Sequence, residues 1–130
     1  MIYIVGMGPG AEEQMTGQAI RALEESDVIV GYPVYLELLG ARFQEKEFLS
    51  TPMRQEVERC RMAIESAEGG KTTAIISSGD AGVYGMADLT LEMAEGEDVS
   101  IEVIPGVTAA LSGAALLGAP LGHDFAVISL

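Results

Sequence analysis

The regular alternation of short apolar runs with helical patterns is the feature that most constrains this fold. The predicted strands are residues 2–5, 27–31, 45–49, 72–77, 99–104 and 125–130. The predicted helices lie between them, at residues 16–25, 34–39, 53–67, around 86–93, and in an alanine-rich segment that ends near residue 117. Strands that alternate with helices indicate βαβ units and a parallel sheet, and runs that are apolar throughout are typical of strands covered on both faces. The sequence therefore predicts an α/β fold, an open parallel sheet of about five strands with helices on both faces.

The domain organisation follows from the same pattern. Residues 1–117 are predicted to form one α/β domain, and residues 118–124 (GAPLGHD) form a linker. Residues 125–130 (FAVISL) are predicted to form one more strand, and no helix follows it. We expect the chain to be the front part of a longer protein.

Composition excludes several classes of function. The net charge of −13 disfavours nucleic acid as a partner, since nucleic-acid binding needs a basic surface. No run approaches the roughly 20 apolar residues of a membrane span, so we expect no membrane partner and a cytoplasmic location. Cys60 is the only cysteine, which leaves no disulfide and no thiolate metal cluster. Its place on the apolar face of a predicted helix favours a packed thiol, and no metal site is predicted.

Three predicted strands are followed by loops rich in glycine and other small residues. The loops are GMGPG at 6–10, SSGDAGVYG at 77–85 and PGVTAA at 105–110. In a parallel sheet, the loops that leave the carboxyl ends of the strands open at one edge, where ligands bind. The sequence therefore predicts a ligand site built from these three loops.

The first loop formally fits the dinucleotide pattern G-x-G-x-x-G/A, but its chemistry argues against a pyrophosphate. Pro9 removes a backbone N–H from the turn. Glu12 and Glu13 add negative charge where a pyrophosphate would lie. A P-loop is excluded because no Gly-Lys-Ser/Thr follows. An NAD-binding dehydrogenase domain therefore stays only as a distant alternative.

The loops instead favour a nucleoside-like ligand without phosphate, since none of them contains a basic residue. The Asp80 carboxylate could accept hydrogen bonds from a ribose diol, Val83 could face a flat ring, and the glycines would let the ligand approach the backbone. S-adenosylmethionine (SAM) meets these requirements. The alternatives are that Asp80 caps the next helix and that the third loop is only a tight strand–helix turn.

In their order and spacing, GMGPG, SGDAGVYG and EVIPGVTAA resemble the tetrapyrrole (corrin/porphyrin) methylase family of SAM-dependent methyltransferases. The resemblance covers the whole chain but about half of a typical member. VIVGYPVYLELL, SSGDAGVYGMA and HDFAVISL are most similar to the members that methylate C17 of (cobalt-)precorrin-3B, with linked ring contraction, in cobalamin biosynthesis. The resemblance implies two α/β domains with SAM between them. Residues 1–117 would be the first domain, and residues 125–130 would be the first strand of a truncated second domain. The resemblance also implies a tetrapyrrole substrate and a homodimer.

The resemblance also implies particular site residues. The cofactor contacts in this half would be Pro9, Ser78, Gly79, Asp80, Val83, Thr108 and Ala109. Tyr32 stands where relatives acting on uroporphyrinogen have an aspartate, so that substrate is disfavoured and no catalytic residue is assigned. Tyr32 and Tyr35 either line the macrocycle site or pack at the surface. The substrate's carboxylates call for arginine, and Arg54 and Arg42 are the candidates near predicted loops.

Two other functional classes remain open. The chain could belong to a family member acting on a different precorrin, or to a diphthine synthase-like enzyme. It could also be an inactive cofactor-binding fragment that acts only as a binding or assembly module. Because other family contacts fall in the second domain, we expect the isolated chain to be inactive.

Overall fold

The computed structural model describes residues 1–130 and contains one five-stranded sheet. The strand order is β3-β2-β4-β1-β5, and every neighbouring pair is parallel. The strands are β1 (Ile2–Gly6), β2 (Val28–Gly31), β3 (Glu47–Ser50), β4 (Thr73–Ser77) and β5 (Ile101–Ile104). This arrangement confirms the predicted open parallel α/β sheet.

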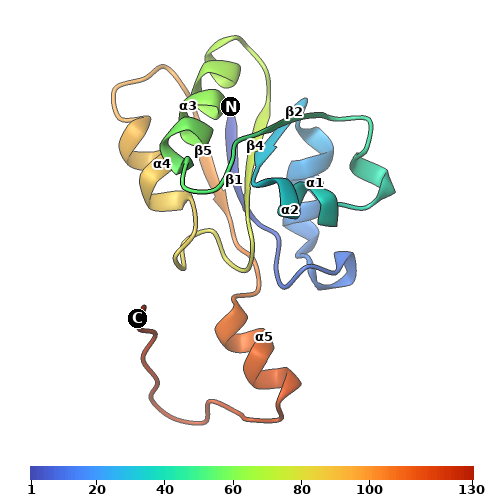
Figure 1. The fold of residues 1–130 in the computed structure, drawn as a ribbon, viewed down its shortest axis with the longest axis vertical. Coiled ribbons are helices and arrows are strands. Elements are labelled where there is room, and N and C mark those ends of the chain that lie inside the picture. The colour runs from blue at the N-terminus through green and yellow to red at the C-terminus, as the bar shows by residue number, and fades with distance from the viewer.

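Helices cover both faces of the sheet (Figure 1). One face packs against α1 (Gly17–Glu25) and α2 (Pro33–Leu38), and the other packs against α3 (Glu56–Glu68) and α4 (Ala87–Met93). Alternate residues of each strand enter opposite cores, so in β1 Ile4 faces α3 and α4 whereas Val5 faces α1 and α2. Short 3-10 turns at Glu12–Gln14 and Ala41–Phe43 complete the connections.

The helix ends follow local chemistry, with one correction. The Thr16 hydroxyl oxygen accepts from the Ala19 N–H at 3.0 Å and caps α1. The prediction of a helix from residue 53 is wrong, because α3 begins at Glu56 and Met53 is exposed. Arg54 has a φ of 64°, which a right-handed helix cannot contain.

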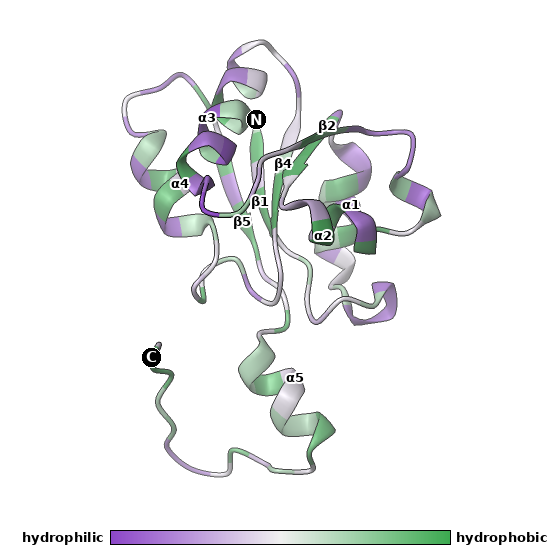
Figure 2. Cartoon of the chain, in the orientation of Figure 1, coloured by the Kyte–Doolittle hydropathy of each residue, from purple (hydrophilic) through white to green (hydrophobic).

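The C-terminal part of the chain lies apart from the sheet. Helix α5 (Ala109–Leu116) buries none of its residues and extends beyond the edge at which the strands end (Figure 1). Figure 2 shows that α5 is apolar over most of its surface, in contrast to the helices with one polar side. No helix of the chain is both long enough and apolar enough to cross a membrane.

Residues 117–130 contain neither helix nor strand. The predicted strand at 125–130 is not formed, because a strand needs a neighbouring strand to pair with and no strand of the sheet pairs with these residues. Their assignment to a second domain, with 118–124 as its linker, stays a prediction.

Candidate ligand-binding site at the carboxyl edge of the sheet

The first two glycine-rich loops are joined backbone to backbone. The Gly8 N–H donates to the Gly79 carbonyl at 3.0 Å, and the Gly79 N–H donates to the Gly8 carbonyl at 2.8 Å. Both residues have positive φ, 70° at Gly8 and 64° at Gly79, a conformation that favours glycine. The two loops therefore form one continuous wall.

The third loop closes onto the first two at Gly106. A Cβ at Gly106 would overlap the carbonyl oxygens of Gly79 and Gly6, and a Cβ at Gly6 would lie 2.8 Å from the Gly106 nitrogen. The expectation that the glycines mainly give a ligand access to the backbone is therefore corrected at Gly6 and Gly106. At these positions, glycine is required because three loops pack against one another.

Asp80 fastens the second loop to the third. Its Oδ1 accepts from the Gly106 N–H and its Oδ2 accepts from the Gly82 N–H, both at 2.9 Å. The alternative that Asp80 caps the next helix is wrong, because α4 begins at Ala87 and the Met86 N–H is bonded to the Ser77 hydroxyl at 3.0 Å. Each carboxylate oxygen of Asp80 retains a further acceptor position, so the same side chain can still accept from a ligand hydroxyl.

The three loops enclose a pocket of about 470 Å³. All seven residues predicted to contact a cofactor line it: Pro9, Ser78, Gly79, Asp80, Val83, Thr108 and Ala109. The pocket is within the size range of small-molecule sites, roughly 300–1,000 Å³. No lysine, arginine or histidine lines it, which fits a ligand without phosphate. Its other lining residues, absent from the prediction, are Gly8, Tyr84, Ala110 and Val127.

Tyr84 is the most informative of the residues that the prediction missed. Its φ of 52° is uncommon for a residue with a side chain, and its hydroxyl donates to the Val127 carbonyl at 3.1 Å. Tyr84 lines both the large pocket and a neighbouring pocket of about 180 Å³, which also share Ser78. The sequence could have indicated Tyr84, because it belongs to the SGDAGVYG motif that supplied other predicted cofactor contacts.

The tyrosines that the sequence suggested for contact with the macrocycle lie on the other half of the edge, after β2. Tyr32 precedes α2 and Tyr35 lies in its first turn, with the two rings edge to face and their centroids 5.7 Å apart. Both rings are half-buried, and Tyr35 lines the smaller pocket. Arg54 is exposed and lines neither pocket. Arg42 is held in exposed ion pairs with two glutamates, away from both pockets.

Arg59 is the arginine that the structure places beside the site. It is 94% buried, lines the smaller pocket and lies with its guanidinium carbon 5.8 Å from the centre of the Tyr32 ring. The sequence carried a signal, because Arg59 is one helical turn before Ala63, on the buried face of α3. Cys60, its neighbour, is fully buried as predicted for a packed thiol, and burial raises the pKa of that thiol.

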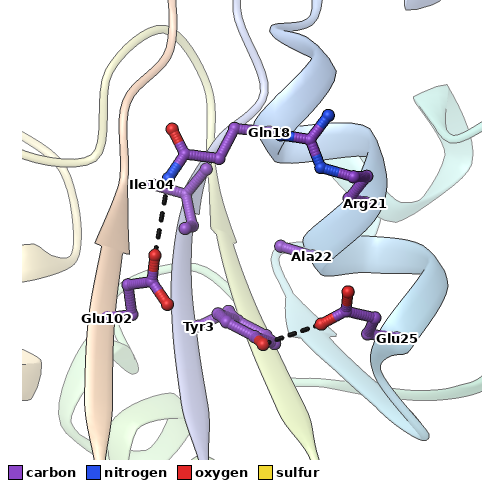
Figure 3. A pocket seen from close by; sticks show the side chains of 7 residues that line it. All are labelled: Tyr3, Gln18, Arg21, Ala22, Glu25, Glu102 and Ile104. Atoms are coloured by element: carbon purple, nitrogen blue, oxygen red, sulfur yellow. Dashed lines mark hydrogen bonds between the residues drawn. The ribbon is translucent and has the colours of Figure 1, made fainter.

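A separate pocket of about 220 Å³ lies against α1 and contains none of the predicted residues (Figure 3). Its polar side chains bond mainly to each other: the Tyr3 hydroxyl donates to Glu25 at 2.8 Å, and Gln18 donates to Glu102 at 3.4 Å. The bond to Glu25 raises the pKa of Tyr3. Since these groups are already paired, we take the three-loop pocket as the candidate site.

The fold and this pocket define an α/β domain with a pocket of small-molecule size, free of basic side chains, at the carboxyl edge of its sheet. The family model for Tetrapyrrole (Corrin/Porphyrin) Methylases matches residues 1–130, and the chain belongs to this family.

Relatives and solved structures agree with the family. The chain is 48% identical to a probable cobalt-factor III C(17)-methyltransferase of Salmonella typhimurium, over 100% of this chain and 55% of that protein. It is 47% identical to a cobalt-factor III methyltransferase of Priestia megaterium, over 99% of this chain and 25% of that protein. The crystal structure of the methyltransferase CobJ superposes with a TM-score of 0.89 at 38% identity, covering 98% of this chain and 54% of that one.

A further structure bears on the cofactor. A uroporphyrin-III C-methyl transferase from Thermus thermophilus, complexed with S-adenosylhomocysteine (SAH), has a TM-score of 0.71 at 28% identity, over 94% of this chain and 50% of that one. The chain thus spans about half the length of the Salmonella relative and of these two structures.

Proposed function

We propose that this chain is the cofactor-binding half of a SAM-dependent C-methyltransferase of cobalamin biosynthesis. The enzyme would methylate C17 of a (cobalt-)precorrin-3B or cobalt-factor III macrocycle, with linked ring contraction. The observation that carries the proposal is the convergence of all seven predicted cofactor residues on one pocket. The relatives named as cobalt-factor III C(17)-methyltransferases support the choice of macrocycle.

The pocket residues fit SAM by their chemistry. SAM supplies a methyl group on a positively charged sulfur and carries no phosphate, which matches a pocket without basic side chains. Asp80 would accept from the ribose hydroxyls, and Val83 would pack against the base. Pro9 and the Gly8–Gly79 pair would fix the wall beside them. Because the ring carbon is already nucleophilic, the main task of the protein is to hold the two reactants in line.

The strand order supports separate places for the cofactor and the macrocycle along this edge of the sheet. The loops after β4, β1 and β5 are neighbours and form the SAM pocket, whereas the segments after β2 and β3 lie together on one side. Tyr32 and Tyr35 lie on that side and would face the macrocycle. Arg54, exposed beyond β3, would meet the substrate only at its periphery.

A cytoplasmic location and a homodimer belong to the same proposal. The single buried cysteine is consistent with a reducing compartment. The exposed apolar surface of α5 is consistent with a further protein surface packing there. A macrocycle other than precorrin-3B remains the second candidate, since members acting on uroporphyrin III and cobalt precorrin-4 share the fold.

Calorimetric titration with SAH tests the proposal in the full-length protein. Wild type should bind, and Asp80→Ala should lower the affinity by about tenfold or more, because a charged acceptor is lost. Asp88→Ala is the matched control, since Asp88 is an exposed carboxylate on α4 that lines neither the SAM pocket nor its neighbour. Absence of SAH binding to wild type, or equal affinities for all three proteins, would refute the proposal.

A further inference from the structure

Arg59 differs from every other cation of this chain. Among the seven lysines and arginines, it alone is buried. Its Nη2 donates to Glu56 at 3.0 Å, and its Nε is buried without any hydrogen-bond partner. A buried donor without a partner costs free energy, and in native proteins such a group calls for an explanation.

The surroundings of Arg59 are arranged as a recess rather than as a packed core. The pocket of about 180 Å³ that it lines is also lined by Tyr35 and Ser78, both of which carry hydroxyl groups. Tyr32 lies against the guanidinium, and such a ring–cation contact helps to orient an arginine. Through Ser78 and Tyr84, the recess adjoins the proposed SAM pocket.

We propose that Arg59, assisted by the hydroxyls of Tyr35 and Ser78, binds a carboxylate of one of the two reactants. A guanidinium recognises a carboxylate through parallel N–H donors, and the free Nε supplies one of them. Two carboxylates could reach the recess: the amino-acid end of SAM, or an acetate or propionate side chain of the macrocycle. The inference rests on the proposed function and adds a residue that sets how a reactant is held.

Local positive charge is needed here because the chain as a whole carries a net charge of −13 and would repel an anionic reactant. Glu56 already offers Arg59 an internal carboxylate from an exposed position, with its side chain 49% accessible. A ligand carboxylate would compete with Glu56 for the guanidinium. Removing Glu56 should therefore favour the ligand, whereas removing Arg59 should disfavour it.

The test is titration of the full-length protein with three probes. SAH carries the amino-acid carboxylate, 5′-methylthioadenosine lacks it, and cobalt-factor III carries only macrocycle carboxylates. The variants are Arg59→Gln, Arg59→Lys and Glu56→Gln. Arg61→Gln is the matched control, because Arg61 is an exposed arginine on the same helix, paired with Glu58. Melting temperatures establish that each variant is folded, and Arg59→Lys, which keeps the charge but not the fork, serves if Arg59→Gln does not fold.

Arg59→Gln should lower the affinity for one of the two carboxylate-bearing probes by about tenfold or more. Arg61→Gln should leave that affinity unchanged, and Glu56→Gln should bind the probe at least as tightly as wild type. A lower affinity for SAH but not for methylthioadenosine assigns the carboxylate to the cofactor. A lower affinity for cobalt-factor III alone assigns it to the macrocycle. The inference would be overturned if Arg59→Gln left the affinity for both carboxylate-bearing probes unchanged. It would also be overturned if Arg59→Gln and Glu56→Gln lost the same amount of affinity, because the two residues would then form only a structural ion pair. A wild-type protein that binds no SAH would instead refute the proposed function itself.

Discussion

Gly106→Ala tests whether the three loops are held together as described. The new Cβ would overlap the backbone carbonyl oxygens of Gly79 and Gly6. No side-chain rotation can relieve a clash with backbone atoms, so the loops must separate. Separation would also strain the bond from the Gly106 N–H to Asp80.

The magnitude follows from these two losses. Overpacking costs about 1–3 kcal/mol, and a weakened hydrogen bond costs about 1 kcal/mol, which gives a free-energy loss of about 3 kcal/mol in all. For a domain of this size, the melting temperature should fall by about 10 °C. SAH binding should weaken as well, because the pocket wall moves.

Thermal unfolding followed by circular dichroism provides the measurement, with Gly113→Ala as the matched control. A Cβ at Gly113 meets nothing within 4 Å, and alanine favours a helix over glycine by up to about 1 kcal/mol. Gly113→Ala should therefore not lower the melting temperature. If Gly106→Ala melted at the wild-type temperature, the described contact between the loops would be incorrect.

Three other predictions concern reactivity, association and ligand choice. The buried thiol of Cys60, with its raised pKa, should react with iodoacetamide only after unfolding, and native-state labelling as fast as that of a free cysteine would contradict its burial. The isolated 130-residue chain should self-associate through exposed apolar residues of α5 such as Leu116, whereas a strictly monomeric sedimentation profile would contradict this. NADH should leave the melting temperature unchanged, because Pro9 and Glu13 disfavour a pyrophosphate; a rise of several degrees would revive the dinucleotide alternative.

The three central strands β1, β2 and β4 could be predicted because each is a short apolar run that is almost entirely buried between the two helical layers, whereas the edge strands β3 and β5 have exposed residues. The run at 72–77, for example, lies within one residue of β4. The strand order could not be predicted in the same way, since it depends on which helix covers which face over long sequence distances. Local backbone geometry could not be predicted from the hydrophobic spacing either, as the helix wrongly predicted from residue 53 shows. Its apolar spacing extended through Arg54, whose positive φ prevents a helix.

Site residues in loops directly after strands could be predicted from the sequence. Site residues whose place depends on contacts between distant parts of the chain could not. The carboxyl ends of parallel strands meet at one edge, and this brought the predicted residues of three distant loops to one pocket. The contact of Gly106 with Gly6 depends on β5 lying beside β1, which no local pattern specifies. Arg59 was missed because a charged residue is normally assigned to the exposed side of a helix, whereas here a pocket lies beside the buried side.

The most direct test of the central claim is a crystal structure of the full-length protein with SAH. We predict SAH among the loops that follow β1, β4 and β5, with its ribose hydroxyls within hydrogen-bond distance of the Asp80 carboxylate. SAH bound instead in the pocket against α1 (Figure 3), or bound with its ribose away from Asp80, would contradict it.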